Sequence, residues 1–127
     1  MAGIAAAWIV GLVITTLVGH FVLVMFLDWL RGRSGLEKKT LRGVPAGITG
    51  ITERIFFASL VAVDASGYST AMMGWLVLKL ATNWNHPDRK DDDRRVWAFS
   101  ALVAGLLSML IAFFGGLFIR WLSGRLQ

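Results

Sequence analysis

The chain of 127 residues contains no cysteine, only two prolines and few charged residues. Without cysteine it has no disulfide, no reactive thiol and no thiolate-bound iron–sulfur cluster. Charged residues make up 17% of the chain and apolar residues 56%, whereas a soluble domain has about 25% charged residues. This composition excludes a disordered tail and a disulfide-stapled secreted module, and it is not that of a soluble globular domain.

Three stretches of the sequence are almost free of charge. Residues 1–27 and 96–119 contain no Asp, Glu, Lys or Arg, and residues 55–78 contain only Asp64. Each stretch is longer than the roughly 20 residues that a helix needs to cross the apolar core of a bilayer. The sequence therefore predicts an all-α integral membrane protein with three transmembrane helices.

These helices would form a small up-down-up bundle, and the short loops leave no room for a soluble domain. Residues 1–127 are thus expected to be a single membrane domain. The Gly-rich entry to the second span, residues 43–52, fits a helix, a kinked segment or an interfacial one. The predicted spans are about 5–30, 52–82 and 96–122, with loops at about 31–45 and 83–95.

Aromatic and charged residues mark the expected ends of the spans. Trp8 and Trp29 are separated by about 31 Å along a helix, the thickness between two membrane interfaces, where Trp concentrates. Trp97 and Trp121 repeat this pattern in the third span. Glu53 and Arg54 open the second span, either as an exposed interfacial anchor or with Arg54 turned inward toward a partner subunit or a lipid phosphate.

Basic residues indicate the orientation, because cytoplasmic loops are enriched in Lys and Arg. Eight lie on the side of the first loop and the C-terminus and five on the other side, which favours an outside N-terminus and a cytoplasmic C-terminus in a bacterial inner membrane. The same loops explain the net charge of +5, so the lipid bilayer and not nucleic acid is the expected partner. The eight are Arg31, Arg33, Lys38, Lys39, Arg42, Arg54, Arg120 and Arg125; the five are Lys79, Arg89, Lys90, Arg94 and Arg95.

Small residues recur every four positions in all three predicted spans. Such ladders let helix backbones approach closely, which is how membrane helices associate. Three helices need fewer than three ladders for their own packing, so we expect a homo-oligomer or docking on other membrane subunits. The ladders are Gly3, Ala7, Gly11, Thr15 and Gly19; Ala58, Ala62, Ser66, Thr70 and Gly74; and Ala104, Ser108, Ala112 and Gly116.

Two ionisable residues are expected deep in the membrane. Counted from Arg54 and Trp29, Asp64 and His20 lie about 15 Å and 13 Å from the same membrane face, so the two side chains are able to pair. Such groups mark either a proton or cation path or an interhelical hydrogen bond. Further candidates for the path are Ser66, Tyr68 and Thr70.

The sequence contains no catalytic, metal-binding or phosphate-binding motif, and no motif that identifies a family. We therefore expect no enzyme, no metal and no cofactor. Two functions remain open: a self-associating protein whose oligomer forms a pore or a proton or cation path, and a non-catalytic accessory or scaffold subunit of a larger membrane complex. A polar, wet axis through an oligomer would favour the first, and constant co-purification with a different chain the second.

Overall fold

The structure is a computed structural model, and it describes residues 1–33, 46–84 and 91–125. These residues form four helices and no strand, in agreement with the predicted all-α class. Most of the two predicted loops lies outside the described residues. The helices are α1 (Ala2–Arg33), α2 (Ala46–Ala62), α3 (Tyr68–Trp84) and α4 (Asp91–Arg125).

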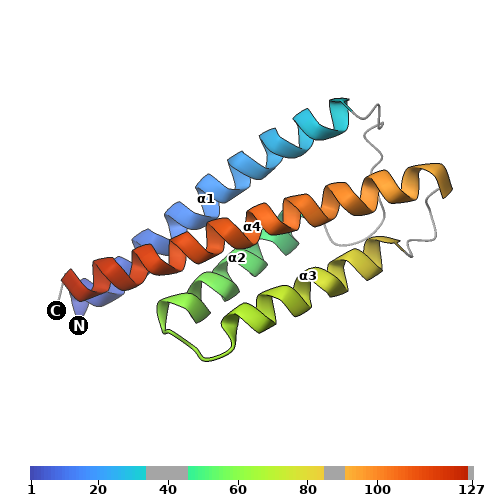
Figure 1. The fold of residues 1–127 in the computed structure, drawn as a ribbon. Coiled ribbons are helices and arrows are strands. Elements are labelled where there is room, and N and C mark those ends of the chain that lie inside the picture. The colour runs from blue at the N-terminus through green and yellow to red at the C-terminus, as the bar shows by residue number, and fades with distance from the viewer. Residues whose placement is uncertain (34–45, 85–90, 126–127) are drawn as a thin grey trace.

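The expected helix over 52–82 is two helices, because the chain reverses direction between α2 and α3 (Figure 1). Asp64 and Gly67 have φ angles of +56° and +81°, which a helix does not allow. Glycine adopts such angles freely and Asp tolerates them better than most residues, so the short polar segment between Val63 and Tyr68 forms a turn. Among the described residues only α1 and α4 are long and apolar enough to cross a membrane, and the third predicted span is not confirmed.

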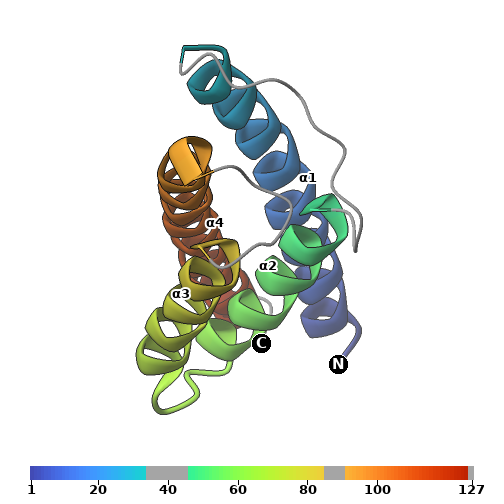
Figure 2. The ribbon, with the colours of Figure 1, turned by 90° about the vertical axis from the view of Figure 1, so that its right-hand side faces the viewer.

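The four helices alternate in direction, and α4 lies at their centre. α4 contacts each of the other three, whereas α1 and α3 do not contact each other within the described residues. α1 is antiparallel to α4, and α2 and α3 form a hairpin beside them (Figures 1 and 2). Both chain ends lie at the same end of the bundle, so the arrangement does not support termini on opposite sides of a membrane.

The first ladder of small residues forms the face of α1 that packs on α4. Gly11 lies against Ile119, since a Cβ on Gly11 would overlap the Ile119 side chain. One turn further along, Thr15 fills the space in front of Gly115 in the same way. The buried residues of this face are Ala7, Gly11, Thr15, Gly19 and Leu23, and Gly3 is half-buried.

The third ladder faces α2. Gly116 lies against Ala58 and Val61, and a Cβ on Gly116 would stand 2.6 Å from the Ala58 carbonyl oxygen. Ser108 and Ala112 are buried on the same side of α4, and Ala104 is half-buried.

The second ladder is divided by the turn. Its first residue, Ala58, is fully buried and Ala62 is half-buried, but Ser66, Thr70 and Gly74 are exposed. Residues at four-residue spacing share one face only while the helix continues. Because the turn ends α2, the first half of the ladder lies on the buried face of α2 and the second half lies on the exposed surface of the turn and α3.

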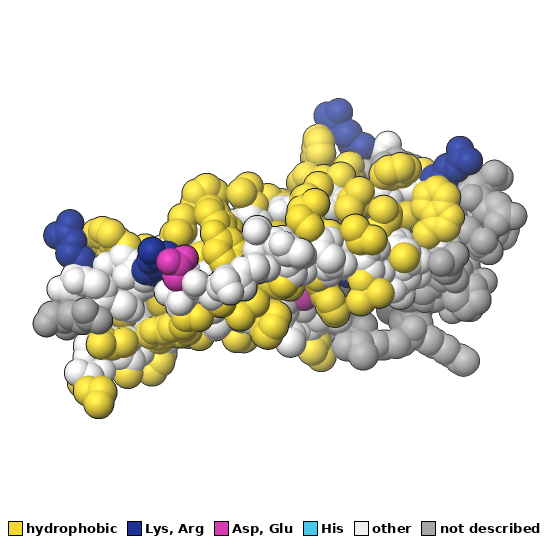
Figure 3. Space-filling model, turned by 60° about the horizontal axis from the view of Figure 1, so that its bottom comes forward, with side chains coloured by type: hydrophobic (Ala, Val, Ile, Leu, Met, Phe, Trp, Pro, Cys, Tyr) yellow, Lys and Arg dark blue, Asp and Glu magenta, His cyan; other side chains and the backbone are white. Residues whose placement is uncertain are grey.

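The outer surface of the bundle is apolar. In the most apolar stretches of α1 and α4 only 22% and 33% of the residues are buried, whereas the core helix of a soluble protein is mostly buried. Hydrophobic side chains cover most of the described part of the face in Figure 3, and Lys and Arg stand out mainly near its two ends. The two long helices therefore present apolar side chains to their surroundings over most of their length.

Candidate functional site

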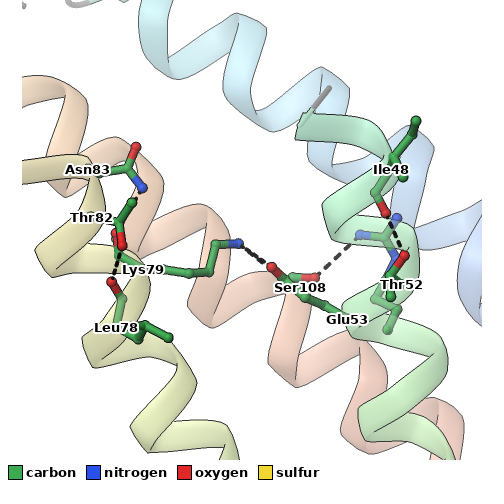
Figure 4. Close-up of polar contacts among 9 residues, drawn as sticks. Ile48, Thr52, Glu53, Leu78, Lys79, Thr82, Asn83 and Ser108 are labelled. Carbon is green, nitrogen blue, oxygen red and sulfur yellow. Dashed lines mark hydrogen bonds and ion pairs between the residues drawn. The ribbon is translucent and has the colours of Figure 1, made fainter. Parts of the chain in front are cut away.

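An ion pair joins α2 to α3 inside the bundle. The Glu53 carboxylate oxygens lie 2.8 Å and 3.0 Å from the Lys79 ammonium nitrogen (Figure 4). Glu53 is 4% exposed and the Lys79 side chain 25%, so the carboxylate is the more enclosed partner. Lys79 donates a hydrogen bond to Oε2, whereas Oε1 lies within ion-pair distance but has no hydrogen-bond partner among the described residues.

Arg54, the neighbour of Glu53, points to the other side of α2 and connects it to α1 and α4. It is 1% exposed, and one guanidinium nitrogen donates a hydrogen bond of 3.3 Å to the Ser108 hydroxyl oxygen (Figure 4). A Cβ on Gly19 would lie 2.6 Å from Arg54 Cδ and Nε, and one on Gly50 would lie 3.3 Å from a terminal nitrogen. These two glycines make the space that the guanidinium occupies.

The Trp residues of α1 and α4 show the depth of this cluster along the bundle. The Arg31 guanidinium lies 4.3 Å from the centre of the Trp97 ring, so the end of α1 and the start of α4 are level. Gly19, which lies against the Arg54 side chain, is about 15–17 Å along α1 from both Trp8 and Trp29. The charged cluster is therefore halfway between the two levels marked by Trp.

The cluster contains one carboxylate and two cations, which gives it a net charge of +1. Arg54 offers five N–H donors. One of them is bonded to Ser108, and the buried Nε has no hydrogen-bond partner among the described residues. A buried charge without full pairing is unfavourable in apolar surroundings, so it is the packing of α1, α2 and α4 around Arg54 that holds this guanidinium in place.

A pocket of about 340 Å³ opens beside Glu53 between α2 and α3. Its walls are mainly aromatic and aliphatic, with Glu53 as its charged group. Ile48 and Phe56 are more than half exposed at 57% and 55%, so the pocket opens to the outer surface of the bundle. The lining residues are Ile48, Thr49, Thr52, Glu53, Phe56, Phe57 and Trp75.

The structure separates Asp64 from His20, so the expected pair is not formed. Asp64 lies in the turn after α2 with a side chain 63% exposed, and its carboxylate is 2.9 Å from Arg120. His20 lies near Gly47 at the other end of α2, about 25 Å away along the helix axis. The expected pairing took Arg54 and Trp29 to lie at one level, whereas Arg54 lies in the middle of α2 beside Gly19, ten residues before Trp29.

The other candidates for a path do not form a continuous polar line. Ser66 and Thr70 are exposed and Tyr68 is half-buried, with its ring 6.2 Å from that of Phe113. The four Trp residues predicted at the membrane interfaces differ in exposure: Trp29 and Trp121 are 55% exposed, Trp8 is half-buried, and Trp97 is 7% exposed beneath Arg31.

Sequence reasoning missed the pairing of Glu53 with Lys79, although the sequence contains a signal for it. Glu53 comes 11 residues before Asp64, and Lys79 comes 12 residues after Gly67. If the segment from Asp64 to Gly67 is read as a turn, the two charges lie at nearly equal distances from it, 11 and 12 residues, and meet in the hairpin. Asp, Ser and Gly are all residues that favour turns.

No group of three or more His, Cys, Asp or Glu side chains that would hold a metal ion occurs in the part of the chain that the structure describes. Comparisons with family models, curated proteins and solved structures found no match to this chain. The function is therefore argued from the geometry alone.

Proposed function

We propose that this protein is a non-catalytic integral membrane protein in which α1 and α4 cross the bilayer and the α2–α3 hairpin packs against them within it. The exposed apolar faces of the two long helices support this placement, because such surfaces are unfavourable in water. The level of the Trp residues also supports it: about 31–36 Å separates the two Trp levels along α1 and α4, close to the thickness of a bilayer.

The arrangement changes the expected orientation. With both chain ends on one side, only two basic residues accompany them, whereas the sequence has nine in or beside the segments that join α1 to α2 and α3 to α4. This distribution favours both termini outside and both connections in the cytoplasm. The two are Arg120 and Arg125; the nine are Arg31, Arg33, Lys38, Lys39, Arg42, Arg89, Lys90, Arg94 and Arg95.

Within the membrane, the proposed function is transfer of protons or cations by an oligomer of this chain. The observation that supports it is the Glu53–Lys79 ion pair at mid-depth, beside a pocket that opens to the bundle surface. Ionisable residues inside a membrane are rare and mark ion pathways and proton relays. Protonation of Glu53 would release the Lys79 ammonium group, so the pair is able to accept and pass on a positive charge. Association of several chains would cover the pocket side and complete the path.

The test is proton and potassium flux in vesicles reconstituted with the purified full chain. Glu53→Gln keeps the shape and removes the charge, so it should abolish flux or its pH dependence in protein that circular dichroism shows to be folded, since leaving Lys79 unpaired also lowers stability. Asp64→Asn is the matched control, because its carboxylate is exposed in the turn, and it should conduct as the wild type does. Equal flux from wild type and Glu53→Gln would contradict the proposal.

A second candidate function, that of an accessory or scaffold subunit, is favoured by the exposed half of the second ladder. Ser66, Thr70 and Gly74 lie on the surface, and a Cβ on Gly74 would meet no atom within 4 Å. Another membrane helix would be able to approach α3 closely there. Gly74→Leu should then release a co-purifying chain, whereas a protein that purifies only with itself would contradict this candidate.

A further inference from the structure

We propose that the ion carried by the charged cluster is a proton, and that Lys79 is the group through which protons enter and leave it. This inference rests on the proposed function and narrows it, because that function leaves open the kind of ion and the group that exchanges it. It depends on the charge balance of the cluster and on which of its members is accessible.

The charge of the cluster disfavours a metal cation. Glu53 is its one carboxylate, and Lys79 and Arg54 are its two cations. A potassium or sodium ion near Glu53 would therefore meet a net charge of +1 and would have to displace Lys79 from the carboxylate. Residues 96–119 contain no charged side chain, so this part of α4 brings no further carboxylate. A proton binds to a single lone pair and needs no vacant space among the side chains, so it is the cation that fits.

Lys79 is the accessible member of the cluster. Its side chain is 25% exposed, whereas Glu53 is 4% exposed and Arg54 1%. The Glu53 oxygen without a hydrogen-bond partner among the described residues, Oε1, is itself inaccessible, and the pocket beside Glu53 offers almost only apolar surface. Lys79 shares a face of α3 with Trp75, which lines this pocket, and thus lies toward the side that association of chains would cover. A proton therefore reaches Glu53 by way of Lys79.

The hydrogen bond between Lys79 and Glu53 provides the transfer step. Lys79 Nζ lies 3.0 Å from Glu53 Oε2, within the range of direct proton transfer. When the proton moves to Oε2, one N–H bond breaks, one O–H bond forms, and the ammonium group becomes a neutral amine. The amine then takes a proton from a hydronium ion in the path and leaves a water molecule, and the reverse steps release one proton further along. Arg54 takes no part in the transfer, because a guanidinium group keeps its protons.

The first experiment separates the two kinds of ion in vesicles that contain the purified wild-type chain. Proton flux is followed with an enclosed pH-sensitive dye and potassium flux with an enclosed potassium-sensitive dye, each against protein-free vesicles. We expect proton flux above this background and potassium flux equal to it. Potassium flux that Glu53→Gln removes would leave the proposed function in place and overturn this inference, whereas flux of neither ion would overturn both.

The second experiment tests the role of Lys79. Lys79→Arg keeps the positive charge beside Glu53, but a guanidinium group does not release a proton. We expect this variant to be folded by circular dichroism and its proton flux to fall to that of protein-free vesicles. Lys39→Arg, the same exchange in the segment that joins α1 to α2, is the matched control and should conduct as the wild type does.

Wild-type proton flux from folded Lys79→Arg would show that Lys79 only positions Glu53, and would overturn its assignment as the group that exchanges protons. If Lys79→Arg did not fold, the first experiment would still decide the kind of ion, because it uses the wild-type chain. Potassium flux that depends on Glu53 would then overturn the inference by itself.

Discussion

α2 and α4 approach closely at Gly116, which makes Gly116→Ala a sharp test of the helix packing. A Cβ at this position would stand 2.5 Å from Val61 Cβ and 2.6 Å from the Ala58 carbonyl oxygen. Carbon atoms in contact are normally about 3.5–4.0 Å apart, so α2 must move away by about 1 Å. Neither neighbour is the end of a flexible side chain, and the strain has no easy relief.

The expected cost is about 1–3 kcal/mol for overpacking, offset by about 1 kcal/mol from the better helix propensity of Ala. Gly74→Ala provides the control, because Gly74 is also helical but has open space in front of it. Gly74→Ala should be neutral or about 1 kcal/mol more stable than the wild type. The gap between the two variants should thus be about 1–3 kcal/mol, the cost of overpacking alone.

The assay is unfolding of the purified protein in mild detergent by added sodium dodecyl sulfate, followed by circular dichroism. Both variants are compared with the wild type at equal lipid and detergent content. If Gly116→Ala were as stable as Gly74→Ala, the close approach of α2 and α4 at this position would be refuted.

Three further predictions follow from the positions of the charged residues. Asp64→Asn, which tolerates the positive φ as Asp does, should change stability by less than about 1 kcal/mol in the same assay, since the ion pair of Asp64 with Arg120 is exposed; a larger loss would place Asp64 in the interior. Arg54→Met should be neutral or stabilising in the same assay, because it removes the excess positive charge of the cluster. Glu53→Gln should cost about 3–5 kcal/mol, because it leaves Lys79 unpaired. A larger loss of stability in Arg54→Met than in Glu53→Gln would contradict the net positive charge of the cluster. Reporter enzymes fused to either chain end should both report the outside, and a cytoplasmic signal from either end would refute the orientation.

The two long helices could be predicted from the sequence because their apolar runs exceed the length of a span and end in charged residues. The expected spans 5–30 and 96–122 lie within α1 and α4, which extend three to five residues further at each end. Hydropathy alone does not report where a helix begins or ends beyond its apolar run, so the predicted spans are shorter than the helices.

The hairpin was missed because the run from residue 55 to 78 has the length and the low charge of a single span. The turn from Asp64 to Gly67 occupies only a few positions, and an apolar window averages over them. The length of the run favoured one helix, whereas the turn-forming residues from Asp64 to Gly67 favoured two. The structure has two helices, because Asp64 and Gly67 adopt positive φ angles that end α2.

Because the turn was missed, the expected positions of Arg54 and Asp64 were also wrong. With one long helix, Arg54 was expected at a membrane face and Asp64 in the interior; in the hairpin, Arg54 is buried inside the bundle and Asp64 is exposed in the turn. The ladder of α1, in contrast, needed no knowledge of the turn, and its residues do form the buried face of that helix. Predictions local to one helix were thus more reliable than those that depended on how two segments meet.

The central claim is that the α2–α3 hairpin brings Glu53 and Lys79 together inside the bundle, and charge exchange between the two positions tests it most directly. The single variants Glu53→Lys and Lys79→Glu each place like charges side by side, and both should lose folded protein in the detergent unfolding assay. The double variant restores one positive and one negative charge across the same gap. We predict that it recovers at least 1 kcal/mol relative to the sum of the two single losses, within the range of coupling between contacting residues. Strictly additive losses in the double variant would show that the two side chains do not meet, and would contradict the account.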